Sequence, residues 1–161
     1  MQTVKEVPEP TQIFLPLRET CHSKPLVICH PMRPGTSGKL FTTNGVKETR
    51  VFFGTCQTCD NEYYPHYEIV KDADVKFMKL YKPDQFFSST KSGIFEVGLL
   101  RFFTQIVAHG SCEFSNLTLS YCETFVKNTK DELSRQVLLD AFLMFHIALK
   151  VRFKHNLLLI F

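Results

Sequence analysis

Residues 39–59 read KLFTTNGVKETRVFFGTCQTC and contain the clearest structural signals in the first half of the chain. Asn44-Gly45 is a strong signal for a two-residue hairpin turn, because both residue types tolerate the positive φ angles that such turns require. The turn joins a predicted strand at 39–42 to a second one at 46–53. The second strand leads directly into Gly54-Thr55-Cys56-Gln57-Thr58-Cys59, so the hairpin carries a CxxC motif at its end.

The CxxC motif predicts a metal site. Its spacing lets two thiolates approach one ion from a tight turn, and Cys21 lies about one hairpin upstream. A ligand turn, a hairpin, a second ligand turn and a further strand is the order of elements in a zinc ribbon. Tetrahedral zinc needs four nitrogen or sulfur donors, and Cys21, Cys56 and Cys59 supply three. We therefore expect zinc as the cofactor, in a structural role.

The fourth donor has three candidates: His22, Cys29 and His30. His22 is adjacent to Cys21, so binding of both residues to one ion would strain the turn. Cys29 and His30 follow residues 24–28, which can return as a short strand. We favour Cys29, because four-cysteine sites are the commoner ribbon type. The predicted ligands are thus Cys21, Cys29, Cys56 and Cys59, with His30 or His22 as alternatives to Cys29.

The hydrophobic period changes after the predicted strands at 62–70 and 76–81. Apolar residues recur at helical spacing from Phe95 to Ile106, with Ser92 as a candidate N-cap and Gly110 as the end. A second helix is predicted from Phe114 to Phe125 with Ser111 as its cap. A third opens at a capping box over 129–132 and continues to Leu149.

These elements predict an α+β fold. An irregular lead-in over 1–14 precedes a zinc-ribbon-like β module over 15–90, and a packed three-helix region follows over 91–154. The remaining residues, 155–161, form an apolar tail that ends in Leu157-Leu158-Leu159-Ile160-Phe161. Five exposed apolar residues at a chain end favour aggregation, so the tail either docks on the core or marks a truncated C-terminus. We expect a truncated or mis-joined C-terminus.

Composition narrows the class of protein. The chain has 161 residues, 44% of them hydrophobic and 22% charged, which is typical of a globular protein. Residues 1–10 resemble no secretion signal, and no apolar run reaches the roughly 18 residues of a membrane span. We therefore expect an intracellular protein, nuclear or cytoplasmic and not secreted, without a membrane partner. In that setting paired cysteines indicate metal ligands or buried thiols rather than disulfides.

Nucleic acid is the weaker of the binding predictions. The net charge of +3 permits contact with phosphates without requiring it. Basic residues in the β half are interleaved with aromatic ones, as in surfaces that combine phosphate contacts with base stacking. The candidates are Lys39, Lys47, Arg50, Lys71 and Lys76. A solvated face over a Phe-rich core explains the same pattern equally well.

No catalytic residue is predicted. The chain has no Gly-rich phosphate loop and no recognisable nucleophile elbow, and its acids are scattered. No small-molecule substrate is evident. Cys112 and Cys122 lie on predicted helices, where buried thiols are expected. Two alternatives stay open: a thiol or redox enzyme that uses Cys56 and Cys59, and an inactive fragment.

The chain from Cys21 to about Leu149 resembles the CxC-type cysteine-cluster domains associated with KDZ transposases, in the fifth class of that series. The likeness is carried by short motifs: residues 40–45, 54–59, 63–67, 94–100, 109–114 and 138–142. The resemblance implies a zinc-chelating, non-catalytic module of a transposon-derived protein, in contact with DNA, protein or a transposase partner. It also implies that Cys56 and Cys59 form one ligand pair and that Cys21 belongs to the other. Lys24 departs from the family pattern, which leads one to expect a second cysteine there.

Overall fold

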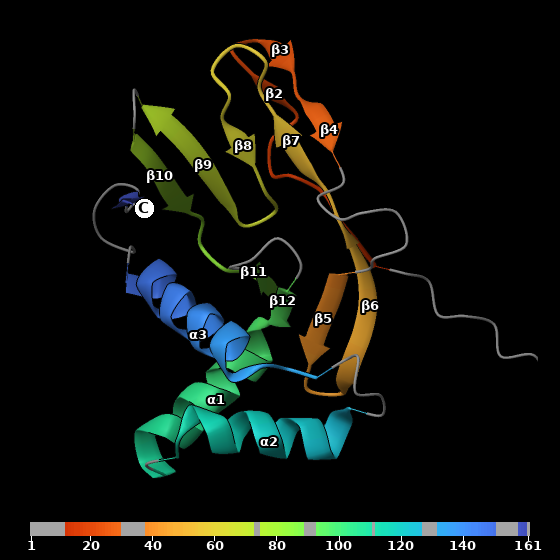
Figure 1. Cartoon of the computed structure of the whole chain (residues 1–161), viewed down its shortest axis with the longest axis vertical. Helices are drawn as coiled ribbons and strands as arrows, with labels where there is room; N and C mark the ends of the chain where they lie inside the picture. Colours follow the sequence, from red (N-terminus) through yellow and green to blue (C-terminus); the bar gives the residue numbers. More distant parts are fainter. Residues whose placement is uncertain are drawn as a thin grey trace, which may run out of the picture.

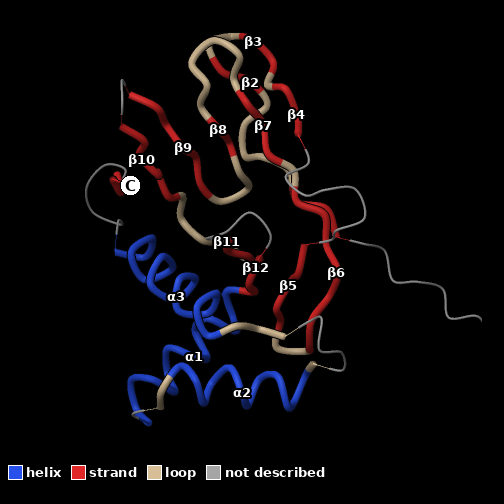
Figure 2. The backbone as a smooth tube through the Cα atoms, viewed as in Figure 1, coloured by secondary structure: helices blue, strands red, loops and turns tan. Residues whose placement is uncertain are grey.

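The computed structural model describes residues 12–29, 38–72, 75–88, 93–110, 112–126 and 132–150, together with the backbone of 158–160. The fold is α+β, as predicted. Strands occupy the first 96 residues and three helices follow among the described residues (Figures 1 and 2).

The helices match the predicted order with shifted starts. They are α1 (Val97–Gly110), α2 (Phe114–Phe125) and α3 (Arg135–Lys150). Phe95, which we expected at the start of the first helix, lies on a strand instead. The cap of α2 is Glu113 rather than Ser111, and the predicted caps Ser92, Ser111 and 129–131 lie outside the described residues. At α3 the Ser134 hydroxyl accepts a hydrogen bond from the Val137 N–H at 3.2 Å, so Ser134 caps this helix.

The predicted hairpin is confirmed. Strands β5 (Gly38–Thr42) and β6 (Gly45–Val51) pair antiparallel, with Thr42 opposite Gly45. The two unpaired turn residues are therefore Thr43 and Asn44, one position earlier than the Asn-Gly signal suggests. Gly45 has a φ of +124°, which explains the need for glycine at this place.

A five-stranded sheet is built around this hairpin in the order β1-β6-β5-β12-β11. The added strands are β1 (Gln12–Phe14), β11 (Phe86–Ser88) and β12 (Gly93–Glu96). Both β1 and β12 pair parallel with their neighbours, β6 and β5. Parallel pairing requires long connections, so neither contact was visible in the local sequence.

A six-stranded sheet has the order β13-β10-β9-β8-β7-β4. Its strands are β4 (Val27–Cys29), β7 (Phe53–Thr55), β8 (Glu62–Tyr63), β9 (Tyr67–Asp72), β10 (Val75–Leu80) and β13 (Leu158–Ile160). The predicted strand at 62–70 is thus split, because Tyr64-Pro65-His66 interrupts it. The backbone of β13 pairs antiparallel with β10, so this part of the apolar tail lies against the sheet. A separate hairpin consists of β2 (Thr20–Cys21) and β3 (Lys24–Pro25).

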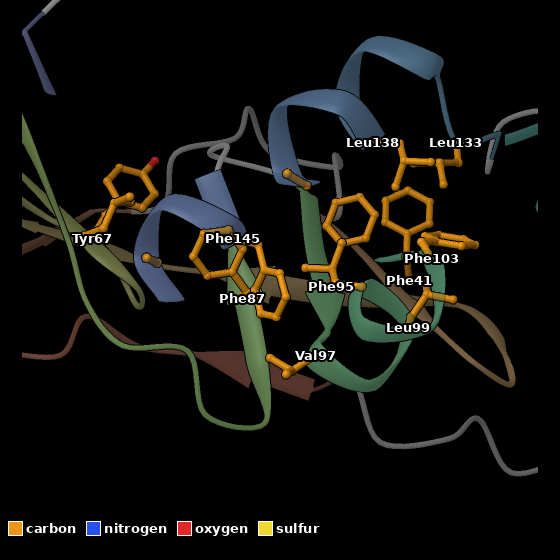
Figure 3. Packing of buried hydrophobic residues seen from close by; sticks show 14 of the residues in the cluster. Phe41, Tyr67, Phe87, Phe95, Val97, Leu99, Phe103, Leu133, Leu138 and Phe145 are labelled. Carbon is orange, nitrogen blue, oxygen red and sulfur yellow. The ribbon is translucent and has the colours of Figure 1, made fainter. Parts of the chain in front are cut away.

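The main core lies between the sheets and the helices and is rich in phenylalanine (Figure 3). Phe87, Phe95 and Phe145 are fully buried. Phe95 on β12 stacks on Phe41 of β5 with ring centroids 4.9 Å apart, and Phe87 meets Phe145 of α3 edge to face at 5.8 Å. Phenylalanine side chains therefore pack the strands against each other and against α3. The domain boundaries at 14, 90 and 154 stay a prediction.

Candidate metal centre

Cys56 and Cys59 occupy the turn between β7 and β8, which pair antiparallel through Gly54 and Tyr63. The turn is closed by backbone hydrogen bonds: the Cys56 N–H donates to the Asn61 carbonyl at 3.0 Å, and the Asp60 N–H donates to the Cys56 carbonyl at 2.9 Å. Asp60 has a φ of 56°, which turns the chain back into β8. The Thr58 N–H donates to the Cys56 sulfur at 3.4 Å. A backbone amide that donates to a cysteine sulfur favours the thiolate, the form that binds metals.

Cys21 and His22 come from the turn of the β2–β3 hairpin, in which Cys21 is opposite Lys24. The two turn residues, His22 and Ser23, have φ values of 52° and 61°. Positive φ at both positions is the pattern of the tight hairpin turn that matches the twist of its strands. Neither residue is glycine, so this backbone is held in a sparsely populated region, which is a feature that clusters at functional sites. The conformation places His22 beside its neighbour Cys21.

The two turns meet in space. The ligand atoms of Cys21, His22, Cys56 and Cys59, one per residue, all lie within 4.8 Å of one another, and we call these four residues the cysteine–histidine group. In Figure 1 the β2–β3 hairpin lies beside the β7–β8 turn, at the end of the six-stranded sheet. Residues about 35 positions apart along the chain thus converge.

The spacing within the cysteine–histidine group suits a tetrahedral ion. The sulfur atoms of Cys21 and Cys59 are 3.7 Å apart. With zinc–sulfur bonds of about 2.3 Å, the edge of a regular tetrahedron is about 3.8 Å. Three sulfurs and one imidazole are also a common donor set of structural zinc. The residues present therefore fit such an ion by donor type and by distance.

Two thiol pKa values in the group move in opposite directions. The hydrogen bond from the Thr58 amide is the main cause that lowers the pKa of Cys56 to about 7. Burial is the main cause that raises the pKa of Cys59 to about 11. Without an ion, the Cys56 sulfur therefore loses its proton at a lower pH than the Cys59 sulfur. A divalent cation would displace the remaining protons, because only deprotonated ligands bind it.

A small apolar cluster supports the group. Leu26, Cys56 and Tyr63 are buried in it, and Cys21 and Cys59 pack against them. The Leu26 N–H donates to the Glu19 carbonyl at 2.9 Å, which fixes the segment after the hairpin. Leu26 lies so close to Gly54 that a Cβ at this glycine would be 2.8 Å from the Leu26 Cδ1 atom. We call the five packed residues the Leu26 cluster: Leu26, Cys56, Tyr63, Cys21 and Cys59.

Two candidates for the fourth ligand, Cys29 and His30, are not found in the cysteine–histidine group. Cys29 is not in the cysteine–histidine group: it is on β4, opposite Phe53, and its thiol donates to the Val27 carbonyl at 3.7 Å. His30 lies outside the described residues. His22, the candidate that adjacency to Cys21 argued against, is the one that lies with the three cysteines. Tyr63, which the sequence offered only as an aromatic residue of the 63–67 motif, was not predicted to be near the site; its hydroxyl donates a hydrogen bond to the Cys21 sulfur at 2.9 Å.

The five basic candidates are spread over two sheets. In β5 and β6, Leu40 pairs with Lys47, so Lys47 lies on the face opposite to Lys39, because side chains alternate along a strand. Arg50 follows Lys47 by three residues and therefore lies on the opposite face from it. Lys71 and Lys76 are directly opposite each other on β9 and β10. Their role in nucleic-acid binding stays a prediction.

Four further cysteines and histidines, Cys112, Cys122, His66 and His146, pack in or near the hydrophobic core. All six cysteines are free thiols. Cys112 and Cys122 are partly buried against the main core, and the Leu133 N–H donates to the Cys122 sulfur at 3.4 Å. His146 on α3 shares a hydrogen bond of 3.0 Å with the Thr104 hydroxyl of α1. His66 is packed near Phe14 and Phe87, and burial lowers its pKa to about 4.

No helix in the described part of the chain combines the length and the apolar composition that crossing a bilayer requires. Comparison with curated proteins and with solved structures gave no significant match. A family model described as a CxC5 like cysteine cluster associated with KDZ transposases matches residues 10–125, which contain the entire cysteine–histidine group. The match covers most of the chain and confirms the resemblance, although it ends before the last of the motifs, residues 138–142. The chain therefore belongs to the family of CxC5 like cysteine clusters associated with KDZ transposases.

Proposed function

We propose that the cysteine–histidine group binds one structural zinc ion and that the domain is a non-catalytic, zinc-ribbon-like binding module. The observation that carries this proposal is the convergence of three sulfurs and one imidazole, from two separate turns, within 4.8 Å. We assign the four ligands to Cys21, His22, Cys56 and Cys59. When bound, the ion would act by joining the β2–β3 hairpin to the β7–β8 turn, as structural zinc does in small modules that cannot bury a core of their own.

Thiol redox chemistry is the competing function. In favour of it, the pKa of Cys56 is lowered to about 7, so part of this sulfur is a nucleophilic thiolate at neutral pH. Against it, the Cys56 side chain is almost fully buried, with 3% exposure, and its turn lies between two strands. Redox CxxC motifs use a partly exposed cysteine at a helix N-terminus. A metal ligand suits this position better.

The wider setting follows from the family. Its association with KDZ transposases supports a role in a transposon-derived protein, nuclear or cytoplasmic, where the module would contact DNA, protein or a transposase partner. Contact with DNA has the weaker support, since the five basic candidates do not share one face. Binding isotherms with duplex DNA at two salt concentrations would test it. A loss of affinity at the higher salt is expected for phosphate contacts, and no affinity at low salt would reject DNA as a partner.

Elemental analysis of the purified chain tests the metal proposal. We expect about one zinc per chain, as in other four-ligand structural sites, and its loss in the Cys56→Ser variant. Cys112→Ser is the matched control, because Cys112 lies away from the group and should leave the zinc content unchanged. A zinc-free protein whose Cys56 reacts rapidly with iodoacetamide near neutral pH would instead favour redox chemistry.

A further inference from the structure

Tyr63 lies next to the cysteine–histidine group without belonging to it. Its hydroxyl donates to the Cys21 sulfur at 2.9 Å, which is short for a hydrogen bond to sulfur. Only 4% of the residue is exposed. A buried polar hydroxyl needs hydrogen-bond partners, and the Tyr63 hydroxyl has two, the Cys21 sulfur and the Asn61 side chain.

The ring of Tyr63 is held on several sides. Tyr63 lies on β8 and pairs with Gly54 of β7. Its side chain packs in the Leu26 cluster, together with Cys56. The Arg18 guanidinium lies over the ring at 5.9 Å from its centroid. Arg18 is in turn 3.9 Å from the carboxylate of Glu68, a residue that is itself buried. These contacts hold the Tyr63 side chain in place, with its hydroxyl next to Cys21.

We propose that Tyr63 is a positioning residue of the metal centre, which donates a hydrogen bond to the ligand sulfur of Cys21 and so orients and stabilises that ligand. This inference rests on the proposed function. A hydrogen bond to a thiolate withdraws negative charge from the sulfur and fixes the direction of its lone pairs. Partners of this kind, one shell away from the ion, commonly change metal affinity by about 10- to 100-fold.

Cobalt(II) is the probe, because it occupies tetrahedral zinc sites and its sulfur-to-cobalt charge-transfer band reports on the thiolates. In Tyr63→Phe we expect this band to move to lower energy, because the Cys21 sulfur loses a stabilising hydrogen bond. Competition with a chelator should show an affinity for cobalt about tenfold weaker than in the wild type. A purely structural role for Tyr63 would not shift the band.

Tyr64→Phe is the matched control. Tyr64 is the next residue, and its hydroxyl donates to a Glu62 carboxylate oxygen at 2.6 Å and not to a cysteine. This variant should keep the wild-type band and affinity. If Tyr63→Phe also keeps both, the role of Tyr63 is refuted while the metal site stands. If the wild type takes up no cobalt, the metal site itself is refuted, and the role of Tyr63 with it.

A second measurement avoids substitution altogether. In the wild type loaded with cadmium-113, a proton–cadmium correlation should contain a cross-peak from the Tyr63 hydroxyl, transmitted through its hydrogen bond to the Cys21 sulfur. The Thr58 amide, which donates to the Cys56 sulfur, should give a comparable cross-peak and serves as the internal reference. A cross-peak from Thr58 without one from Tyr63 would overturn the inference.

Discussion

The sulfur atoms of Cys21 and Cys59 lie 3.7 Å apart, although 38 residues separate them along the chain. In the absence of an ion, nothing in the chemistry of two thiols requires this proximity, since a hydrogen bond between thiols is weak. The distance equals, within about 0.1 Å, the edge of a zinc-centred tetrahedron of sulfurs. The arrangement of both residues therefore fits the shared ion that we propose.

The first prediction concerns the fourth ligand. His22→Ala should weaken zinc binding about a hundredfold, because structural zinc contributes about 10–16 kcal/mol and four donors share it at roughly 3 kcal/mol each. Cys29→Ser is the control and should leave the affinity unchanged, since Cys29 lies on β4 and outside the cysteine–histidine group. Competition with a chromophoric chelator measures both. The opposite result, a loss in Cys29→Ser alone, would return the fourth position to Cys29.

Only part of this candidate site could be predicted from the sequence. The CxxC motif and its hairpin were visible, because their signals are local: two cysteines three positions apart, and Asn44-Gly45. The sequence favoured Cys29 as the fourth donor on the frequency of four-cysteine ribbons. What it could not reveal is that His22 and Ser23 both adopt positive φ, which brings an imidazole next to the adjacent sulfur. The contact of Tyr63 with Cys21 had no local signal, since the two residues lie 42 positions apart.

The fold shows the same division between local and distant signals. The β5–β6 hairpin and the three helices follow from turn residues and apolar spacing. Phe95 was misplaced, because its spacing continues the apolar period of α1 back into a strand. The parallel pairing of β12 with β5 puts Phe95 opposite Phe41, and no local pattern encodes a partner more than fifty residues away. Non-local pairing therefore overrides the helical period at this position.

Removal of the metal should destabilise the region around the cysteine–histidine group and leave the main core intact. The Leu26 cluster is small, whereas the main core contains four fully buried phenylalanine and leucine side chains on β11, β12 and α3: Phe87, Phe95, Leu138 and Phe145. A strong chelator should raise hydrogen exchange in β2, β3 and the 56–61 turn, because the proposed ion would join them. Exchange in α3 should change little. Equal loss of protection in α3 would mean that the two regions unfold as one unit.

Burial on α3 predicts the cost of truncating a leucine. Leu138 is fully buried in the main core, and Leu143 on the same helix is 51% exposed (Figure 3 shows Leu138). Leu138→Ala should lower the free energy of unfolding by about 2–5 kcal/mol, through lost burial and a residual cavity. Leu143→Ala should cost about 1 kcal/mol or less, since its side chain already contacts solvent. Urea denaturation followed by circular dichroism measures both, and similar costs would contradict the packing of α3.

His66 should make stability depend on pH. Burial lowers its pKa to about 4 in the folded state, and its Nδ1 atom is buried without a hydrogen-bond partner among the described residues. In the unfolded chain the pKa returns to about 6.5, so the unfolded state binds the proton first as the pH falls. The stabilising contribution is therefore complete above pH 6.5 and is lost progressively as the pH falls toward 4. At 1.36 kcal/mol per pKa unit, the difference between about 6.5 and about 4 corresponds to a complete loss of about 3 kcal/mol.

His66→Phe tests this dependence, because it removes the titrating group and keeps an aromatic ring beside Phe14 and Phe87. The free energy of unfolding should fall less steeply between pH 6.5 and 4 in this variant than in the wild type. Other titrating groups, the metal ligands included, contribute to both proteins and cancel in the difference. Parallel curves for His66→Phe and the wild type would show that His66 is not protonated on unfolding.

Gly54 joins the fold to the metal centre, and its replacement should affect both. A Cβ at this position would lie 2.8 Å from the Leu26 Cδ1 atom and 3.0 Å from its Cβ. The second atom is anchored to the backbone, so the clash cannot be relieved by rotating the leucine side chain. Gly54→Ala should therefore lower the free energy of unfolding by about 1–3 kcal/mol, which is the usual cost of overpacking. It should also weaken metal binding, because Leu26 packs against Cys56.

Two further variants separate the clash from a general effect of alanine. In Gly54→Ala with Leu26→Ala, the closest contact, with the Leu26 Cδ1 atom at 2.8 Å, is removed and only the contact with Cβ at 3.0 Å is left, so the double variant should be more stable than the sum of the two single losses predicts. Gly98→Ala on α1 is the control, because a Cβ there meets only the Glu96 side chain, at 3.8 Å. Alanine in a helix is favoured over glycine, and this variant should gain about 0.5–1 kcal/mol. Strict additivity at positions 26 and 54 would show that the two residues do not compete for the same space, and the packing that supports the cysteine–histidine group would then have to come from elsewhere.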